Sequence, residues 1–417
     1  MLGRLLDESY PRVVRARVTL VTVARLTANS AYRFAPPFLA TIARDTGVSL
    51  ATLGLAISIS ELGGVLSPFV GRLADGWPRR RTMTAGLAGI GVSSFAIAAS
   101  PNIALFTAAL FGIGMCKTFF DIALGGWIAD HVRYERRGRV VGLTELSWAG
   151  GLLIGVPIMG LVAAVTSWRG AYVVAGIAVT TLAILVRAKL DETYHPDHHP
   201  DGLPPFDEAS ASAPAAVAAT VATVRPGRGP LLAVLGSFAM LMGAAQCAFV
   251  TFGSWLEDTF DVGTGGLALV SFGLGLGELL ASSSTVRLTD RWGKRRSVVR
   301  GASLMIPTGL LLTTIAHDHI GTGLALLWVY VVGFEFAIVS GISLASNLVP
   351  GRPSTGIGLV VGAGTLGRAA TAVVATTLYE HHGATAPFAL GTAFAAGCIA
   401  LLIAGTRAER THAGAGA

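Results

Sequence analysis

Apolar runs of about 20 residues recur along the whole chain, separated by shorter polar segments. A run of this length is enough for an α-helix to cross the hydrocarbon core of a bilayer. The pattern predicts about twelve spans, at roughly 18–42, 50–70, 83–100, 103–129, 141–165, 170–188, 230–254, 265–285, 298–316, 321–347, 356–379 and 386–405. The predicted fold class is therefore an all-α polytopic membrane protein.

One long polar stretch divides these spans into two sets. Residues 191–229 are rich in Pro, Ala, Ser and Asp and have no apolar periodicity, which is typical of a flexible linker. The predicted domains are an N-terminal six-helix half at 1–190 and a C-terminal six-helix half at 230–417. The linker holds His195, His198 and His199 without a partner Cys or second His cluster, so we expect no metal site.

A polar loop occurs once in each half. Its first copy is GRLADGWPRRR at 71–81, and the second, 215 positions later, is VRLTDRWGKRR at 286–296. Each copy follows one apolar run and precedes another. Two copies of a mixed acidic and basic loop indicate two related membrane halves, an arrangement typical of transporters.

Composition and charge fit this picture. The chain is 52% hydrophobic and 13% charged, whereas about a quarter of a soluble domain is charged. If both termini lie on one side, the opposite side holds only Arg44 and Arg169 as basic residues. The positive-inside rule then places both termini and the linker in the cytoplasm of an inner or plasma membrane protein. The net charge of +7 thus reflects topology and predicts no nucleic-acid partner.

The chain resembles the major facilitator superfamily over its whole length apart from the linker and tails. The first loop matches that family's signature, Gly-x-Leu-Ala-Asp-Arg-x-Gly-Arg-Arg, except at Gly76 and Pro78. The second copy restores Arg291 and Gly293 but has Val286 in place of the first glycine. The resemblance implies two six-helix halves that transport solute by alternating access. We expect a monomer whose partners are the lipid bilayer, a small-molecule substrate and protons.

The resemblance also implies a gate at the cytoplasmic loops. Asp75 would end the second helix and face the positive N-terminus of a neighbouring helix, while the arginines at 79–81 would pair with Asp130. Alternatively, the arginines only anchor the topology. A neutral stretch around Asn347 replaces Asp130 in the second half, so we expect an asymmetric gate. The predicted gate residues are Gly71, Asp75, Arg79, Arg80, Arg81, Asp130, Asp290, Lys294 and Arg295.

The fifth span carries small residues at helical spacing. They form the predicted helix-packing motif Gly151, Gly155, Pro157 and Gly160, because small residues let two helices approach closely and Pro bends the backbone. The motif is similar to the fifth-helix signature of proton-coupled antiporters, although Val156 splits the Gly-Pro pair and the final double glycine is missing. This similarity favours export, and pure helix packing is the competing explanation.

Ionisable and polar groups inside the predicted spans are the candidate substrate and proton pathway. Charged groups in a bilayer cost ~2.5–3.5 kcal/mol each on insertion scales, so they need partners and usually have functions. The four cations, four anions and two amides are Arg25, Asn29, Arg33, Glu61, Lys117, Asp121, Gln246, Glu278, Glu335 and Arg368. Their balance indicates mutual neutralisation in a polar centre, with purely structural ion pairs as the alternative.

Spacing relates several of these groups. Arg25, Asn29 and Arg33 fall on one stripe of the first helix, and Lys117 and Asp121 are placed to pair at i and i+4. Arg33 is the predicted substrate-side cation, because a guanidinium stays charged and can bind an anion or carbonyl group in bidentate fashion.

The spacing of the carboxylates is close to the offset of the repeated loop. Asp121 and Glu335 are 214 positions apart and Glu61 and Glu278 are 217 apart, so each pair occupies equivalent places in the two halves. Arg368 is placed to pair with Glu335 in an adjacent helix. We expect the proton to be carried by Asp121 or Glu335, and after these by Glu61.

The sequence therefore predicts a secondary transporter for a small organic solute, with proton antiport and export as the first choice. The alternative is a proton symporter that imports an anionic or sugar-like solute, which the stripe of Arg25 and Arg33 favours. A membrane enzyme or sensor on a carrier fold is less favoured, because the spans hold no His and their cysteines have no visible partner. No phosphate-binding loop of the form Gly-x-x-x-x-Gly-Lys-Ser/Thr occurs, so we expect no cofactor and no ATP-driven pump.

Overall fold

The computed structural model describes residues 2–66, 77–132, 136–190, 228–345, 348 and 353–414. Within these ranges every regular element is a helix. The longer helices are α1 (Arg12–Arg33), α2 (Leu39–Thr46), α3 (Leu50–Leu62), α5 (Arg79–Ala98), α6 (Ile103–His131), α7 (Arg137–Gly150), α8 (Val156–Val165), α9 (Trp168–Lys189), α11 (Arg228–Phe260), α12 (Thr264–Trp292), α13 (Lys294–Leu312), α14 (Ile320–Ala345), α15 (Pro353–His382) and α16 (Thr385–Gly414).

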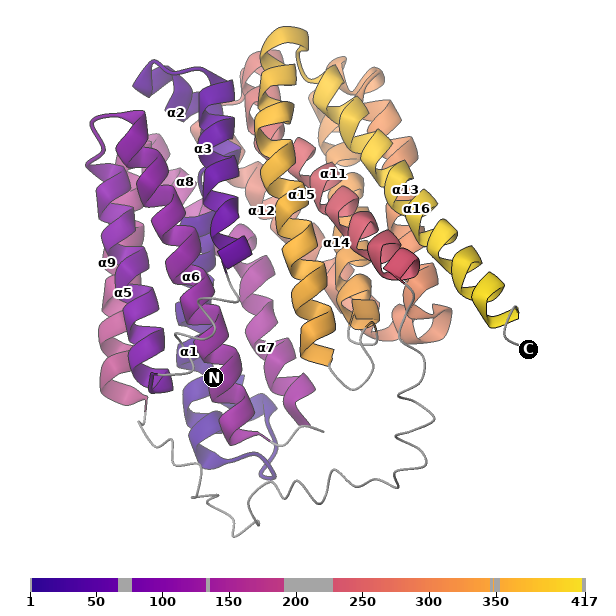
Figure 1. The fold of residues 1–417 in the computed structure, drawn as a ribbon. Coiled ribbons are helices and arrows are strands. Elements are labelled where there is room, and N and C mark those ends of the chain that lie inside the picture. The colour runs from indigo at the N-terminus through magenta and orange to yellow at the C-terminus, as the bar shows by residue number, and fades with distance from the viewer. Residues whose placement is uncertain are drawn as a thin grey trace.

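The helices form two groups that lie side by side, with α1 to α9 in one and α11 to α16 in the other (Figure 1). Where the groups meet, α3 packs along α15, and α8 packs along α12. This is the polytopic all-α fold with two six-helix halves that the sequence predicts. Most of the predicted linker lies outside the described residues, so the domain boundaries at 190 and 230 stay a prediction.

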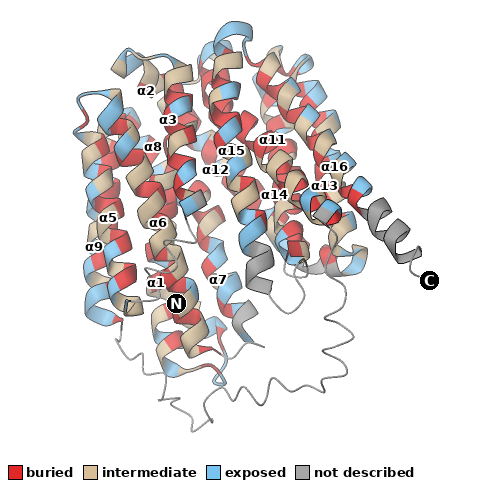
Figure 2. Ribbon diagram, in the orientation of Figure 1, coloured by how far each residue is buried: buried red, intermediate tan, exposed pale blue. Residues whose placement is uncertain are grey.

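Eight helices within the described ranges are long and apolar enough to cross a membrane. Four others complete the predicted set of about twelve: α3 is shorter, and α1, α5 and α13 carry arginines. Buried and exposed residues alternate along most of the helices (Figure 2). The exposed apolar side chains include Val165 and Leu269, which are 83% and 72% exposed, as expected for a surface that contacts lipid. The chain is a multi-pass membrane protein.

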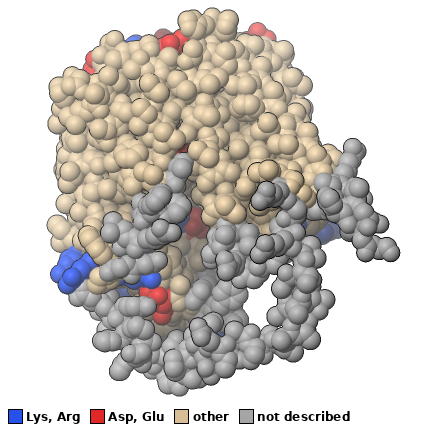
Figure 3. All heavy atoms as spheres, viewed as in Figure 1, with Lys and Arg blue, Asp and Glu red and all other residues tan. Residues whose placement is uncertain are grey.

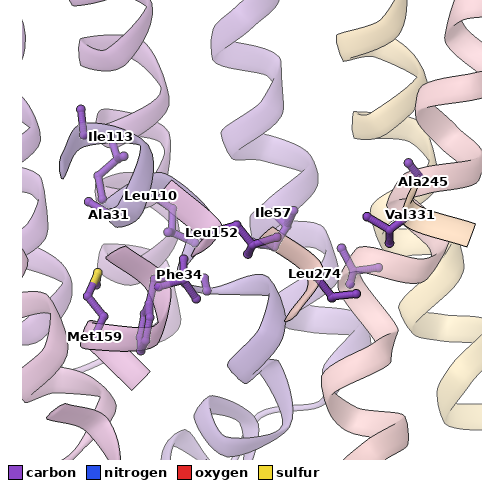
Figure 4. Packing of buried hydrophobic residues seen from close by; sticks show 14 of the residues in the cluster. Ala31, Phe34, Ile57, Leu110, Ile113, Leu152, Met159, Ala245, Leu274 and Val331 are labelled. Atoms are coloured by element: carbon purple, nitrogen blue, oxygen red, sulfur yellow. The ribbon is translucent and has the colours of Figure 1, made fainter. Parts of the chain in front are cut away.

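Charged side chains are unevenly distributed over the surface. On the face that Figure 3 shows, a broad and mostly uncharged band covers the upper part of the molecule, and Lys and Arg side chains gather below it. Inside, one hydrophobic cluster runs through both halves; it includes Ile57, Leu152 and Leu274, from the second, fifth and eighth spans (Figure 4).

The first helix differs from its predicted span. It begins at Arg12 and ends at Arg33, whereas the apolar run predicts 18–42. Pro36 and Pro37 follow the helix, and a proline lacks the N–H that a continuous helix needs. The chain turns there and continues as α2, with Phe34 and Phe38 stacked at a centroid separation of 4.6 Å. The predicted boundary was wrong because the apolar character continues through this break.

The glycines of the fifth span pack against two helices. Between α7 and α8, residues Gly151–Gly155 form one π-helical turn, just before Pro157. A methyl group on Gly155 would lie 1.7 Å from Ser30 Oγ in α1, and one on Gly160 would lie 2.7 Å from the ring of Phe38. These contacts agree with the helix-packing interpretation of the motif; its link to export stays a prediction.

The two polar loops turn differently. Gly293, between α12 and α13, has a φ of +83°, a conformation that favours glycine because it has no Cβ. Pro78 stands at the matching position before α5 and has a φ of −57°. Gly71 and Asp75 lie outside the described residues, as does the side chain of Asp290.

Candidate functional site

Arg33, the last residue of α1, forms an ion pair with Glu278 of α12 in the other half. Arg33 Nη1 and Nη2 lie 2.8 and 2.5 Å from the two carboxylate oxygens, and Nη1 also donates to the carbonyl of Trp148 at 3.0 Å. The Glu278 side chain is only 1% exposed. Bidentate pairing of this kind is strong and directional. Arg33, the predicted substrate-side cation, is thus neutralised in this conformation.

A second ion pair also joins the halves. Arg368 of α15 lies 2.6 Å from Glu61 of α3, and the hydroxyl of Tyr32 donates to the other oxygen of Glu61 at 2.8 Å. The prediction that Arg368 pairs with Glu335 is therefore wrong. The pair forms with a residue of the other half because α15 packs along α3.

In the N-terminal half, Asp121 neutralises two cations. Its oxygens lie 2.9 Å from Arg25 Nε and 2.5 Å from Lys117 Nζ, so the predicted i, i+4 pairing of Lys117 is present. Arg25 also reaches Glu145 of α7 at 2.7 Å. The amide of Asn29, on the same stripe, donates to the Ser147 carbonyl at 3.0 Å. The first-helix stripe therefore binds α6 and α7.

Glu335 of α14 has a different environment. It is 3% exposed and accepts a hydrogen bond from Ser282 at 2.7 Å. Within the described residues it forms no ion pair. Ser282 lies one helical turn after Glu278, so Glu335 is close to the ion pair of Arg33. A buried carboxyl group without a cation is most stable when it carries a proton, because the ionised form is costly to bury.

Trp148 is a central residue that the sequence pattern did not single out. Its ring lies 4.6 Å from the Arg33 guanidinium carbon and 5.5 Å from Lys117 Nζ. Cations over an indole face are attracted by the ring quadrupole, so Trp148 holds two cations of different helices in place. A single Trp in an apolar span carries no periodic signal that could have indicated this.

The halves also touch on the side of the molecule where α2 and the turn after α11 lie, which we call the α2 face. Arg44 of α2 pairs with Glu257 of α11, and Thr41 donates to the same carboxylate at 2.8 Å. A methyl group on Gly253 would lie 1.9 Å from the Pro37 carbonyl oxygen. The sequence indicated Arg44 only as a topology residue, since its partner lies 213 positions away.

Three contacts of predicted gate residues join elements of the same half. Arg79 Nε lies 3.0 Å from Asp130 Oδ2, and Arg80 donates to the Leu190 carbonyl at 3.4 Å. In the other half, Arg295 donates to the Leu402 carbonyl. Lys294 is partly buried at the start of α13, and Arg81 lies in the first turn of α5. The predicted pair of Arg79 and Asp130 is present, and its role in gating stays a prediction.

Gln246 of α11 is the second amide among the candidate residues. It is 1% exposed, and among the described residues neither its Oε1 nor its Nε2 has a hydrogen-bond partner. The three cysteines, Cys116, Cys247 and Cys398, are free thiols. Among the described residues, no group of three or more His, Cys, Asp or Glu side chains is placed to hold a metal ion.

Comparisons with known proteins agree with this architecture. The sequence profile of the Major Facilitator Superfamily matches residues 21–371. The chain is 25% identical over 302 residues to an uncharacterized MFS-type transporter of Bacillus subtilis, YwfA, covering 71% of this chain and 68% of that protein. It is 24% identical over 356 residues to a chloramphenicol efflux pump of Mycobacterium tuberculosis, covering 82% of this chain and 80% of the pump. The crystal structure of a bacterial homolog of the human lysosomal transporter Spinster has the same fold, with a TM-score of 0.71, 11% identity and 94% of both chains covered.

Proposed function

Because this chain belongs to the major facilitator superfamily, we propose that it exports a small organic solute in exchange for protons. The two halves would rock about the central charged residues and expose them to one membrane face at a time. Proton coupling is supported by Glu335, a buried carboxyl group that accepts a hydrogen bond from a hydroxyl and, in the described part of the chain, pairs with no cation.

In this proposal, Glu335 couples its proton to the contact between the halves. Its partner Ser282 lies one turn from Glu278, which binds Arg33 across the interface. Loss of the proton would add a second negative charge near Glu278 and give Arg33 a competing partner. Proton binding and release at Glu335 therefore changes the strength of an ion pair that must rearrange when the halves move.

The other carboxylates are less suited to this role. Asp121 already binds two cations, and Glu61 binds Arg368 and Tyr32. Protonation of either carboxylate would disrupt an ion pair that it already makes. Of the three carboxylates predicted from the sequence as proton carriers, Glu335 is the one that we propose.

Two observations support export as the direction of transport, a similar protein and one motif. A relative that aligns with 82% of this chain is named as a chloramphenicol efflux pump, and the fifth-span glycines are similar to an antiporter signature. The alternative of an anion importer loses support, because Arg25 and Arg33 each bind a carboxylate. Export by proton antiport is the function that we propose.

Vesicles containing the purified protein and an imposed pH gradient test this function. Chloramphenicol and other neutral drugs serve as first test solutes. In an antiporter, protons leaving an acidic interior drive solute inward, so accumulation in acid-inside vesicles is expected. Accumulation in alkaline-inside vesicles would instead identify a symporter. Accumulation that ignores both gradients would contradict proton coupling.

A further inference from the structure

The 3₁₀ helix η1 (Leu2–Leu5) folds back along the start of α1. The Leu2 amide donates a hydrogen bond to Thr19 Oγ1 at 2.9 Å. A methyl group on Gly3 would lie 1.8 Å from the Arg15 carbonyl oxygen, so the two backbones touch. η1 therefore lies beside the first two turns of α1.

The residues that follow η1 attach it to the rest of the N-terminal half. Leu6 and Tyr10 are 3% and 6% exposed and belong to the main hydrophobic cluster. The Tyr10 hydroxyl donates to the Arg136 carbonyl at 3.4 Å, and Asp7 pairs with Arg139 at 3.5 Å. The place of η1 is thus set by buried packing and by polar contacts with the start of α7.

This place lies at the edge of the bilayer. Residues 12–17 of α1 include three arginines, and the apolar run of the first span starts at residue 18. Because charged side chains are costly in hydrocarbon, the membrane boundary crosses α1 near residue 18. Leu2 is bonded to Thr19 and so lies at that depth. The four residues of η1 extend over about 8 Å at a rise of about 2 Å each, so the whole of η1 stays near the headgroup level.

The side chains that η1 and the start of α1 expose are basic and apolar. Leu5 is 52% exposed, and Arg4 and Arg12 are exposed as well. Arg15 is half-buried, and its Nε is buried without a hydrogen-bond partner among the described residues. Within the same part of the chain, none of these three arginines pairs with a carboxylate. The surface therefore offers unneutralised guanidinium groups beside an exposed leucine.

These arginines belong to adjacent elements. Arg12, Arg15 and Thr19 are spaced at i, i+3 and i+7, so they share one side of α1. This is the side on which η1 lies, because Thr19 binds Leu2. Arg4 directly follows the glycine that abuts Arg15. The basic groups are thus placed around η1 at the level of the lipid headgroups.

We propose that η1 and the first turns of α1 bind the headgroup of an anionic phospholipid, with Leu5 inserted into the lipid layer. Guanidinium groups bind phosphate oxygens through charge-assisted hydrogen bonds, and a net positive surface favours a headgroup that carries no cation of its own. An apolar side chain beside basic ones is typical of segments that lie in the membrane interface. This surface is separate from the central charged residues, so the inference does not depend on the transported solute or on proton coupling.

Quenching by brominated lipids tests this surface in the full-length protein. Leu5→Trp places a fluorophore on η1, and the signal of the seven native tryptophans is subtracted with the parent protein. The protein is reconstituted in phosphatidylcholine vesicles with increasing amounts of lipid that has brominated acyl chains, either phosphatidylglycerol or phosphatidylcholine. Arg15→Gln is the test variant and Arg17→Gln is the matched control. Arg17 is also an arginine of α1 whose Nε has no partner among the described residues, but two residues along a helix place it nearly opposite Arg15.

We expect brominated phosphatidylglycerol to reach half-maximal quenching at about fivefold lower content than brominated phosphatidylcholine, the factor expected for one basic residue near an anionic surface. Arg15→Gln should remove most of this preference, and Arg17→Gln should keep it. Equal quenching by the two lipids, or equal loss of the preference in both variants, would overturn the inference. Quenching by neither lipid would show that Leu5 faces water. A preference abolished by added glycerol 3-phosphate would identify a soluble phosphate as the ligand and refute the lipid.

A second measurement needs no change at Leu5 and decides the question if Leu5→Trp does not fold. Melting temperatures are compared in nanodiscs of phosphatidylcholine and in nanodiscs that also contain phosphatidylglycerol. The anionic lipid should raise the melting temperature of the wild type and of Arg17→Gln more than that of Arg15→Gln. Equal shifts in all three proteins would contradict a site at Arg15.

Discussion

Asp121 of α6 and Glu335 of α14 are 214 residues apart, close to the 215-residue offset of the repeated loop, yet their environments differ. Asp121 binds Arg25 and Lys117, whereas Glu335 is bonded to the hydroxyl of Ser282. The Asp121 side chain is 25% exposed, whereas Glu335 is 3% exposed. The first carboxylate belongs to an ion-pair network, and the second is the group that we propose as the proton carrier.

Replacing each carboxyl group separately by its amide should give the largest difference in folding stability between the two halves. Asp121→Asn leaves Lys117 without its carboxylate and weakens the hold on Arg25, so we expect a loss of about 4 kcal/mol of folding free energy, since breaking a buried pair costs about 3–5. Glu335→Gln keeps an acceptor for Ser282 and should cost less than about 1 kcal/mol. Denaturant unfolding in detergent measures both. Equal losses would show that the two environments do not differ as described.

The stability of the protein should depend on whether one or both members of the ion pair of Arg33 and Glu278 are replaced. Glu278→Gln leaves the buried guanidinium of Arg33 without its counter-ion, at a cost of about 3 kcal/mol. The double variant Arg33→Met with Glu278→Met removes both charges, and apolar replacement of a whole buried pair is often neutral. Melting temperatures of the single and double variants check this. A double variant less stable than Glu278→Gln would show that the charges themselves stabilise the interface.

The polar loops offer a second comparison between repeats. Arg79 binds Asp130 in the first half, and Pro78 and Gly293 give the two loops different backbones. We expect Asp75→Asn to slow transport several-fold more than Asp290→Asn, measured as initial rates in vesicles at matched protein levels. Equal rates in the two variants would argue against an asymmetric gate.

The smallest stability effect is expected at the α2 face. The Arg44 side chain is 62% exposed, so its pair with Glu257 should contribute no more than about 1 kcal/mol. Glu257→Gln should nevertheless favour separation of the halves there. Spin labels at Ala104 and Thr259, on opposite halves, should report longer distances in the variant. An unchanged distance distribution would mean that this contact does not hold the α2 face closed.

The sequence predicted contacts that depend on local geometry. Lys117 and Asp121 are four residues apart on one helix, and their pairing follows from helical periodicity alone. The fold class also followed, because span length and the repeated loop are visible without tertiary information.

Contacts between the halves could not be predicted in the same way. Arg33 and Glu278 are 245 residues apart, and Arg368 and Glu61 are 307 apart. Which cation meets which carboxylate depends on how α1, α3, α12 and α15 pack, and a charge balance allows several pairings. The end of α1 was misplaced for a related reason, because two prolines broke the helix inside a continuous apolar run.

The central claim is that Glu335 carries the coupled proton, and Glu335→Gln in vesicles tests it most directly. With a transported solute, we predict that the variant still exchanges labelled for unlabelled solute across the membrane, because binding and rocking remain. It should no longer accumulate solute when the interior is made acidic. Full accumulation driven by the pH gradient in this variant would contradict the account.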